Sequence, residues 1–244
     1  MAHPQVDRPA FYALAPGAWR DFVTLLHPPY TAWHLSYVAL GAAAAPTLHA
    51  DRLAAALGAF FLGVGVCAHA LDELNGRPLR TSIPDAVLVT LAGLSLAGAV
   101  ALGVVGVATV GASLVPFIAA GAFLVVAYNL ELFGGRFHTD FWFAAAWGAF
   151  PAATAYWANA VSIAPAGACV VLACFGLSVA QRRLSTPVRA LRRRAVSVSG
   201  EITLDDGRQQ QLSRESLIAP LDGALRALAM GVVLLAIGFV IVRL

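Results

Sequence analysis

The sequence predicts an all-α, polytopic membrane helix bundle, and two properties of the chain predict it. Apolar residues make up 59% of the 244 residues and charged residues only 12%. This composition lies far from the soluble average and excludes a water-soluble globular protein. The apolar residues also gather into seven runs, most of them near the roughly 20 residues that a helix needs to cross a bilayer. We therefore expect about seven transmembrane helices.

The expected spans follow one another along the chain with short polar connections. They cover residues 30–48, 53–71, 86–107, 113–132, 141–161, 165–180 and 221–242. The sixth is the shortest. A cytoplasmic N-terminal segment at residues 1–29 precedes the first span, so residues 30–180 form a six-helix transmembrane core and residues 217–244 contain the last helix.

One sizeable polar segment, residues 181–216, separates the sixth and seventh spans. Residues 181–194 carry several arginines and are expected to form a basic, amphipathic helix at the membrane surface. Apolar and polar residues then alternate on both sides of Asp206 and Gly207, a pattern typical of a β-hairpin. A lone hairpin is only marginally stable in water, so we expect it to lean on the bundle or the headgroups and to cap the cytoplasmic mouth.

The arginines predict the orientation of the chain, because Lys and Arg stay on the cytoplasmic side. Nearly all arginines of the expected connections fall on the side of the membrane that holds the N-terminus. The other side has little more than Arg52 and Arg243. We expect a multi-pass protein of the cell inner (plasma) membrane with a cytoplasmic N-terminus. The net charge of +3 then reflects topology and attraction to anionic membrane lipids, and no nucleic-acid partner is expected.

The second span ends in a cluster of ionisable side chains. His69, Asp72 and Glu73 stand at i, i+3 and i+4, so they project from one face of the helix end. Carboxylates combined with water and phosphate oxygens suit Mg²⁺, and the guanidinium of Arg77 one turn later matches phosphate oxygens. The alternative is an interfacial ion pair in which Asp72 binds Arg77 or Arg80 and no ligand.

A second polar cluster lies on the same expected face. It joins the end of the fourth span to the start of the fifth and comprises Tyr128, Asn129, Glu131, Arg136, His138 and Asp140. In a bundle the two clusters are expected to converge over one cavity. The alternative is a surface pair of Glu131 with Arg136 and a solvated His138.

Several motifs resemble the UbiA superfamily of intramembrane prenyltransferases. The run Trp19-Arg-Asp-Phe-Val-Thr-Leu-Leu-His-Pro-Pro-Tyr30 precedes the first span, and His69-Ala-Leu-Asp72-Glu73 with Gly76-Arg-Pro-Leu79 ends the second. Tyr128-Asn-Leu-Glu-Leu-Phe, Asp140 and Trp147-Gly-Ala-Phe-Pro151 are similar to that family's fourth-to-fifth connection and fifth helix. The resemblance covers roughly the first 160 residues and depends on the order of the motifs relative to the spans.

The resemblance implies transfer of a prenyl group from a prenyl pyrophosphate, held through Mg²⁺, to a lipid-soluble acceptor. It implies catalytic roles for Asp72, Glu73 and Arg77, with Mg²⁺ at Asp72 and Glu73. The expected substrate-binding residues are His69, Asn75, Arg80, Tyr128, Asn129, Glu131, His138, Asp140, Arg182 and Arg183. Prenyl pyrophosphate or another isoprenoid lipid is the expected partner.

The chain also departs from the family pattern. Ala68-His69 stands where the family has Asn-Asp, and the second aspartate motif is replaced by Gln181-Arg-Arg-Leu-Ser-Thr-Pro-Val-Arg189. Family members usually have nine spans. Arg182, Arg183 and Arg189 are expected either to take the place of the second metal or simply to anchor the cytoplasmic face.

Two other functions are compatible with the same residues. One is a UbiA-like bundle without catalysis that binds lipid or assists assembly. The other is a metal-dependent, lipid-modifying enzyme, since imidazole with carboxylate suits iron or zinc. Its expected ligands are His69, Asp72, Glu73, Glu131, His138 and Asp140.

Overall fold

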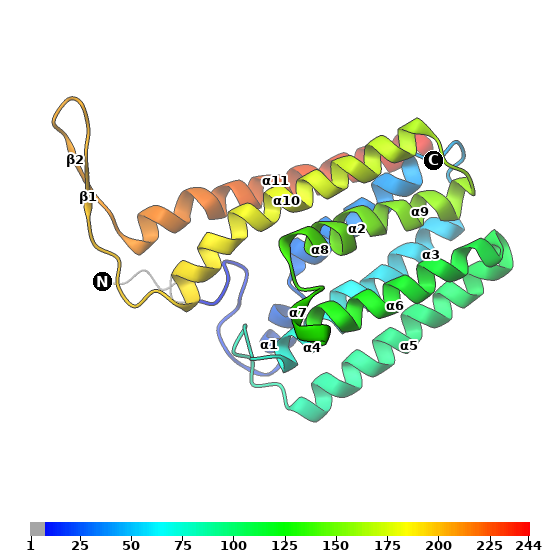
Figure 1. Ribbon diagram of the computed structural model, residues 1–244, viewed down its shortest axis with the longest axis horizontal. Helices are drawn as coiled ribbons and strands as arrows, with labels where there is room; N and C mark the ends of the chain where they lie inside the picture. Colours follow the sequence, from blue (N-terminus) through cyan, green and yellow to red (C-terminus); the bar gives the residue numbers. More distant parts are fainter. Residues whose placement is uncertain (1–7) are drawn as a thin grey trace.

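The computed structural model describes residues 8–244 and shows an all-α bundle with one small hairpin (Figure 1). Residues 1–7 of the expected N-terminal segment lie outside the described residues. The elements are α1 (Ala18–Leu25), α2 (Pro28–Ala43), α3 (Ala50–Phe60), η1 (Phe61–Ala68), α4 (His69–Leu74), α5 (Asp85–Val110), η2 (Ala112–Leu114), α6 (Val115–Asn129), α7 (Leu132–Gly135), α8 (Asp140–Ala144), η3 (Ala145–Ala149), α9 (Phe150–Ala160), α10 (Pro165–Arg193), β1 (Glu201–Thr203), β2 (Gln209–Gln211) and α11 (Arg214–Arg243).

Five of the helical segments in residues 8–244 are long and apolar enough to cross a membrane. They are Ala50–Leu74, Asp85–Val110, Ala112–Asn129, Pro165–Arg193 and Arg214–Arg243. The membrane character predicted from composition is thereby supported. The expected first and fifth spans fold as helices too, but α2 has only 16 residues and the run α8–η3–α9 is not among the five. The count of seven spans stays a prediction.

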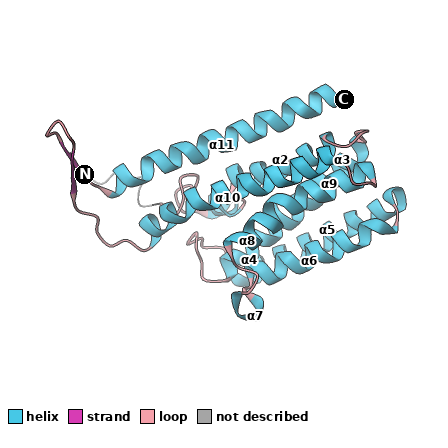
Figure 2. Ribbon diagram, turned by 45° about the horizontal axis from the view of Figure 1, so that its top comes forward, coloured by secondary structure: helices cyan, strands magenta, loops and turns pink. Residues whose placement is uncertain are grey.

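Helix α2 lies in the interior of the bundle and packs against α9 and α11 (Figure 2). Its side chains Trp33, Tyr37 and Val38 are fully buried. The approach to α9 is close, since a Cβ added at Gly41 would lie 2.1 Å from the carbonyl oxygen of Ala152. Small residues permit such backbone contacts between membrane helices. Because α2 is surrounded by protein, its length is not tied to the thickness of the bilayer.

Two helical segments are interrupted by π-helical stretches. η1 separates α3 from α4, and η3 separates α8 from α9. A π-helical turn inserts one extra residue and rotates the side chains that follow, and such turns are frequent at functional sites. The bundle contains a polar cavity and an apolar cavity that are neighbours. Each π-helical stretch contributes one residue that lines both cavities, namely Val64 from η1 and Trp147 from η3.

Helix α10 runs without a break from Pro165 to Arg193. The expected separate surface helix at residues 181–194 is instead the continuation of the sixth helix. Pro187 does not break it, although proline removes one backbone donor. The basic residues therefore stand on a rigid helix that is packed against α8, η3 and α11.

The hairpin forms as predicted, with β1 and β2 antiparallel and Ile202 paired with Gln210. Its position differs from the prediction. Both strands are exposed, and the hairpin projects away from the helices (Figure 1). It does not cap the mouth of the bundle, because its side chains are mostly polar and offer little apolar surface for docking.

The loop between α4 and α5 is fastened to α1 by Asp21. The buried carboxylate of Asp21 accepts hydrogen bonds from the backbone N–H of Ser82 (2.9 Å), from the Ser82 hydroxyl (2.5 Å) and from the backbone N–H of Gly17 (3.1 Å). These bonds, the Ser82 hydroxyl first, hold the pKa of Asp21 below its usual range. The contact joins the N-terminal segment to the loop that follows the second long helix.

We expect Asp21→Asn to lower the free energy of unfolding by about 1–3 kcal/mol at neutral pH, because charged hydrogen bonds are lost. A carboxyl whose pKa is depressed on folding contributes stability above its unfolded pKa of about 4, and this contribution disappears as the pH falls through the lower folded value. The difference from wild type should therefore shrink in acid. Thermal unfolding at neutral and at strongly acidic pH measures this difference in stability. The control is the variant Asp205→Asn, because Asp205 is exposed. An equal difference at both pH values would contradict the assignment.

Candidate functional site

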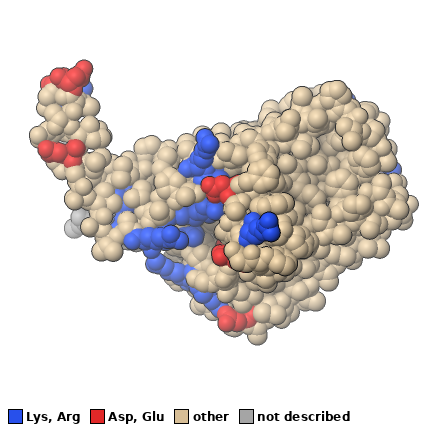
Figure 3. All heavy atoms as spheres, in the orientation of Figure 1, with Lys and Arg blue, Asp and Glu red and all other residues tan. Residues whose placement is uncertain are grey.

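A polar cavity of about 430 Å³ lies at the end of the bundle where α4 and α6 end. Its walls come from segments far apart in the sequence: the N-terminal segment, α2, the end of the second long helix, the end of α6, and the C-terminal half of α10. Figure 3 shows that arginines gather on this end of the molecule, while most of the remaining visible face carries no charge. The convergence of the two sequence clusters over one cavity is thus present in the structure.

One face of α10 supplies the basic wall of the cavity. Arg182, Arg189 and Arg193 recur at i, i+7 and i+11, a spacing that keeps side chains on one helical face, and all three line the cavity. Arg182 donates to the exposed carboxylate of Asp140 at 2.7 Å. Arg189 donates to the Thr186 hydroxyl at 3.2 Å, and Arg193 donates to the Pro9 carbonyl at 3.4 Å. Within residues 8–244, neither Arg189 nor Arg193 forms an ion pair with a carboxylate.

Three carboxylates line the same cavity as these arginines. Asp72 comes from the end of α4, Glu131 follows α6, and Asp222 lies on α11. Arg189 is repelled by Arg182 and Arg193. Buried like charges are costly unless a counter-charge is present. Arg189 and Arg193 line the cavity without a carboxylate partner among the described residues, and they suit an anionic ligand.

Three polar atoms around the cavity lack hydrogen-bond partners among residues 8–244. They are the hydroxyl of Tyr128, Oε1 of Gln181 and Oδ1 of Asp222, each on a residue that lines the cavity. Asp222 otherwise forms a buried ion pair with Arg192 at 2.5 Å, which ties α11 to α10. Most buried polar atoms in folded proteins are paired with protein or water. These atoms add to the polar character of the cavity lining.

Four histidines line the cavity, and all are oriented by backbone carbonyls. Nδ1 of His27, His34, His69 and His138 lies 2.8–3.1 Å from the carbonyl oxygens of Leu25, Trp147, Gly65 and Tyr128, respectively. A neutral imidazole that donates from Nδ1 leaves Nε2 as an acceptor. The rings of His27 and His69 stack with centroids 3.9 Å apart. Burial lowers the pKa of His27 to about 4, so this ring is neutral at physiological pH.

The N-terminal segment closes one side of the cavity. Pro9, Phe11 and Tyr12 line it, and Arg226 lies 4.8 Å from the centroid of the Phe11 ring. Tyr12 contacts Tyr30 edge-on and also contacts the ring of His27. Burial raises the pKa of the Tyr12 hydroxyl well above its usual range. The result is a cluster of aromatic rings in the lining of the cavity.

Eight of the thirteen sequence-predicted site residues line the cavity. They are His69, Asp72, Asn75, Tyr128, Asn129, Glu131, His138 and Arg182. The other five, Glu73, Arg77, Arg80, Asp140 and Arg183, do not line it. Asp140 still acts on the site indirectly through its ion pair with Arg182.

Glu73 has a different environment from the one expected. Its side chain is fully buried and accepts hydrogen bonds from the backbone N–H of Leu79 (2.9 Å) and from the backbone N–H and hydroxyl of Thr81 (2.8 and 2.9 Å). The chain turns back after α4 through positive φ angles at Gly76, Arg77 and Arg80, and the donors of this turn need an acceptor. Both carboxylate oxygens of Glu73 are thus bonded to the loop, and Glu73 does not line the cavity that Asp72 lines.

Arg77 is likewise occupied by the loop. It donates to the carbonyl oxygens of Thr81 (3.2 Å) and Ile83 (2.6 Å) and pairs with Asp85 at the start of α5. In the part of the chain that the structure describes, no three His, Cys, Asp or Glu side chains come together as metal ligands. The six-residue cluster expected for iron or zinc is thus not assembled.

Sequence reasoning missed several residues of the cavity wall. They include Tyr12, His27, Tyr30, His34, Gln181, Arg193 and Asp222. His34 carried a usable signal, because an ionisable residue inside an apolar span is a candidate functional group. Tyr12 carried none, since nothing in the sequence shows that the N-terminal segment folds over α2.

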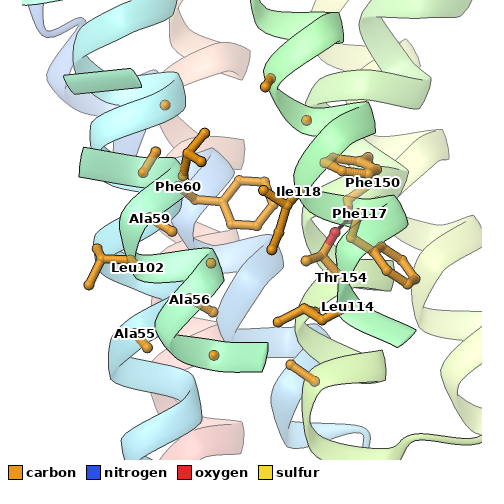
Figure 4. A pocket seen from close by; sticks show the side chains of 18 of the residues that line it. Ala55, Ala56, Ala59, Phe60, Leu102, Leu114, Phe117, Ile118, Phe150 and Thr154 are labelled. Carbon is orange, nitrogen blue, oxygen red and sulfur yellow. Dashed lines mark hydrogen bonds between the residues drawn. The ribbon is translucent and has the colours of Figure 1, made fainter. Parts of the chain in front are cut away.

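A second, apolar cavity of about 290 Å³ lies among α3, α5, α6 and α9. Figure 4 shows Phe60 and Ile118 approaching each other across it, with Phe117 and Phe150 on the far side. Val64 and Trp147 line both cavities, so the polar and apolar cavities meet at these two side chains. Together they offer a polar compartment for a charged group beside an apolar compartment.

No family model, curated protein or solved structure matches this chain.

Proposed function

We propose that this protein is a UbiA-like intramembrane prenyltransferase that binds a prenyl pyrophosphate with its head in the polar cavity. The observation that carries the proposal is the convergence of three arginines of α10 and the carboxylate of Asp72 on one cavity. Guanidinium groups match phosphate oxygens in geometry and charge. The order of sequence motifs that resembles the UbiA superfamily adds independent support.

The cavity residues suit the ionisation of an allylic pyrophosphate. As the carbon–oxygen bond breaks, its electron pair leaves with the pyrophosphate, and Arg182, Arg189 and Arg193 stabilise the developing charge. The aromatic rings of Tyr12 and Tyr30, which also line the cavity, stabilise the allylic cation through cation–π interactions and exclude water. The acceptor captures the cation and gives up a proton.

The residues present fit a single Mg²⁺ ion held by one carboxylate. Asp72 is available, whereas both oxygens of Glu73 are bonded to the loop. Mg²⁺ often binds through one carboxylate together with substrate phosphates and water, so Asp72 and the pyrophosphate would hold a single ion that supplies further charge neutralisation. A clamp of two carboxylate-bound ions does not fit the residues present.

We further propose a multi-pass protein with seven membrane helices and a cytoplasmic N-terminus. The arginines around the polar cavity gather at one end, while Arg52 and Arg243 bind carbonyls at the other end. This asymmetry favours the polar cavity on the cytoplasmic side of the inner membrane.

The proposed function is tested by adding farnesyl pyrophosphate to the purified protein in lipid nanodiscs and measuring the release of pyrophosphate. We expect Mg²⁺-stimulated release of pyrophosphate in the presence of a bacterial lipid extract as acceptor. Asp72→Asn should reduce the rate by at least about a hundredfold, as expected for loss of an electrostatic catalytic group. Arg183→Gln on the exposed face of α10 is the control. Absence of both binding and release would refute the proposal.

The second candidate is a lipid-binding protein without catalysis. The burial of Glu73 in the loop favours it, because the cavity then lacks the second carboxylate of the first acidic motif. Under this candidate, farnesyl pyrophosphate binds but pyrophosphate is not released from wild type, with or without Mg²⁺. The same assay therefore separates the two.

A further inference from the structure

We infer that residues 8–14, here called the N-terminal strap, form a lid on the polar cavity, and that Arg193 couples closure of this lid to binding of the pyrophosphate head. This inference rests on the proposed function and deepens it, because it concerns the regulation of the same site.

The N-terminal strap is part of the cavity lining but not of any regular element. Pro9, Ala10, Phe11 and Tyr12 line the polar cavity. Residues 8–14 form turns and bends and contain neither helix nor strand. Opening of the strap therefore breaks few backbone hydrogen bonds, which is typical of segments that move over ligand sites.

The two ends of the strap are attached with different strength. At its C-terminal end, the backbone N–H of Leu14 donates to the hydroxyl of Thr24, a buried residue of α1, at 3.0 Å. At its N-terminal end, the carbonyl oxygen of Pro9 accepts from Nε of Arg193 in α10 at 3.4 Å. The second bond is longer than is usual for N–H···O and is therefore weak. The strap is thus anchored at Leu14 and able to detach from α10.

Further contacts hold the N-terminal half of the strap to the bundle. Arg192 donates to the carbonyl oxygen of Arg8 at 3.3 Å, and Arg226 of α11 lies 4.8 Å from the centroid of the Phe11 ring. Phe11 also meets the ring of Tyr30 edge-on, with centroids 6.1 Å apart. Long hydrogen bonds and single ring contacts are individually weak. A small additional interaction is therefore enough to shift the strap between open and closed.

Arg193 belongs both to the attachment of the strap and to the lining of the cavity. Its Nε donates to Pro9, and its side chain lines the cavity. Among residues 8–244, the terminal nitrogens of Arg193 have no hydrogen-bond partner. A guanidinium is a planar, rigid fork of five N–H donors, so an anion bound at the terminal nitrogens also fixes the direction of Nε. One side chain can therefore hold the ligand and the strap together.

Electrostatic repulsion gives the coupling its sign. Besides its burial, the charge of Arg189 is disfavoured by Arg182 and Arg193, and Arg189 repels Arg193 in the same measure. A bound pyrophosphate neutralises this repulsion, so Arg193 stays in the cavity lining and keeps its bond to Pro9. Binding then favours the closed strap, and by thermodynamic linkage closure strengthens binding by the same factor.

A lid of this kind suits the proposed reaction. An allylic cation is captured by water unless the site excludes water. Closure driven by the pyrophosphate head stabilises the position of Phe11 and Tyr12 in the cavity lining while the substrate is bound.

Hydrogen exchange of wild type in nanodiscs, with and without inorganic pyrophosphate, tests the coupling. We expect saturating pyrophosphate to slow exchange of the amides in residues 10–14 by at least about fivefold, the lower end of typical couplings between sites. Exchange of the exposed hairpin at residues 201–211 should stay the same and serves as the reference.

The outcomes of this experiment separate the two proposals. Unchanged or faster exchange of the strap, together with saturable binding of pyrophosphate in calorimetry, would overturn the inference and leave the proposed function standing. Failure of wild type to bind pyrophosphate would overturn both.

Phe11→Ala tests the reciprocal effect. The variant removes ring contacts of the strap but no polar group that binds pyrophosphate. We expect it to speed exchange of residues 10–14 and to weaken binding of inorganic pyrophosphate by at least about fivefold. Phe22→Ala is the matched control, because Phe22 is 42% exposed on α1 and does not line the cavity. Equal affinity of the two variants would refute the coupling.

A double variant tests the part played by Arg193. Arg193→Gln removes the contact to the ligand and the contact to the strap together. If the strap acts through Arg193, adding Phe11→Ala to Arg193→Gln should cost no further affinity for pyrophosphate. A full additional loss in the double variant would show that Phe11 acts by another route and would contradict the role of Arg193.

Discussion

Arg189→Gln is expected to weaken the binding of inorganic pyrophosphate by at least about thirtyfold, because loss of one buried, charged contact costs about 2 kcal/mol or more. Arg189 lines the polar cavity and pairs with no carboxylate among the described residues. Its guanidinium is thus available to a ligand. Isothermal titration of the protein in nanodiscs measures the change.

The same variant should not lose stability in the absence of ligand. Burial of the Arg189 guanidinium and repulsion by Arg182 and Arg193 both disfavour its charge, so removing that charge relieves a cost in the absence of an anionic ligand. We therefore expect a melting temperature equal to that of wild type or higher. An arginine with a purely structural role would show the opposite sign, with lower stability and unchanged binding.

Arg183→Gln is the matched control. Arg183 adjoins Arg182 in the sequence but is exposed and does not line the cavity. The control removes the same charge from the same helix, so a general effect of net charge would weaken binding equally in both variants. Equal weakening would contradict the assignment of Arg189 to the anion site.

Glu73→Ala is expected to lower the free energy of unfolding by about 3–5 kcal/mol, one of the largest effects of any single substitution in this chain. The carboxylate is fully buried and accepts three hydrogen bonds from Leu79 and Thr81. Its removal leaves buried donors without acceptors and also leaves a cavity. Chemical unfolding measures the loss.

Glu73→Gln and Asp72→Asn complete the comparison. Glutamine keeps the size of Glu73 but brings an N–H₂ group against backbone donors, so it should also destabilise, whereas Asp72→Asn should leave the unfolding free energy nearly unchanged. Hydrogen exchange at residues 79–81 should rise in the Glu73 variants only. If Glu73 were a metal ligand, its variants would keep their stability and lose only Mg²⁺-stimulated binding.

The sequence predicted which helix ends meet at the polar cavity better than it predicted the surroundings of each side chain. The spacing of His69 and Asp72 and the second cluster at Tyr128 and His138 correctly indicated one cavity, because both clusters follow directly from helix ends. Glu73 stands next to Asp72 in sequence, but a helix separates neighbouring side chains by about 100°. Burial of its side chain under the returning loop could not be foreseen from the spacing.

Helix α10 is a second case in which the sequence did not predict the tertiary arrangement. Composition identified the arginine-rich segment after the sixth span, but it favoured a break between an apolar span and a surface helix. In the structure the helix continues to Arg193 and carries Arg189 and Arg193 over the bundle. Contacts of α10 with α8, η3 and α11 decide this, since tertiary packing overrides local preference.

The sequence by itself determined that this is an all-α membrane protein, where most of its helices lie, and that a hairpin precedes the last one. These features depend on local composition and periodicity, which each segment carries independently. Only the tertiary structure decided that Glu73 supports a loop, that Tyr12 and the arginines of α10 line one cavity, and that an apolar cavity adjoins it at Val64 and Trp147. Such contacts join residues far apart in the chain, and their positions follow from how the helices pack.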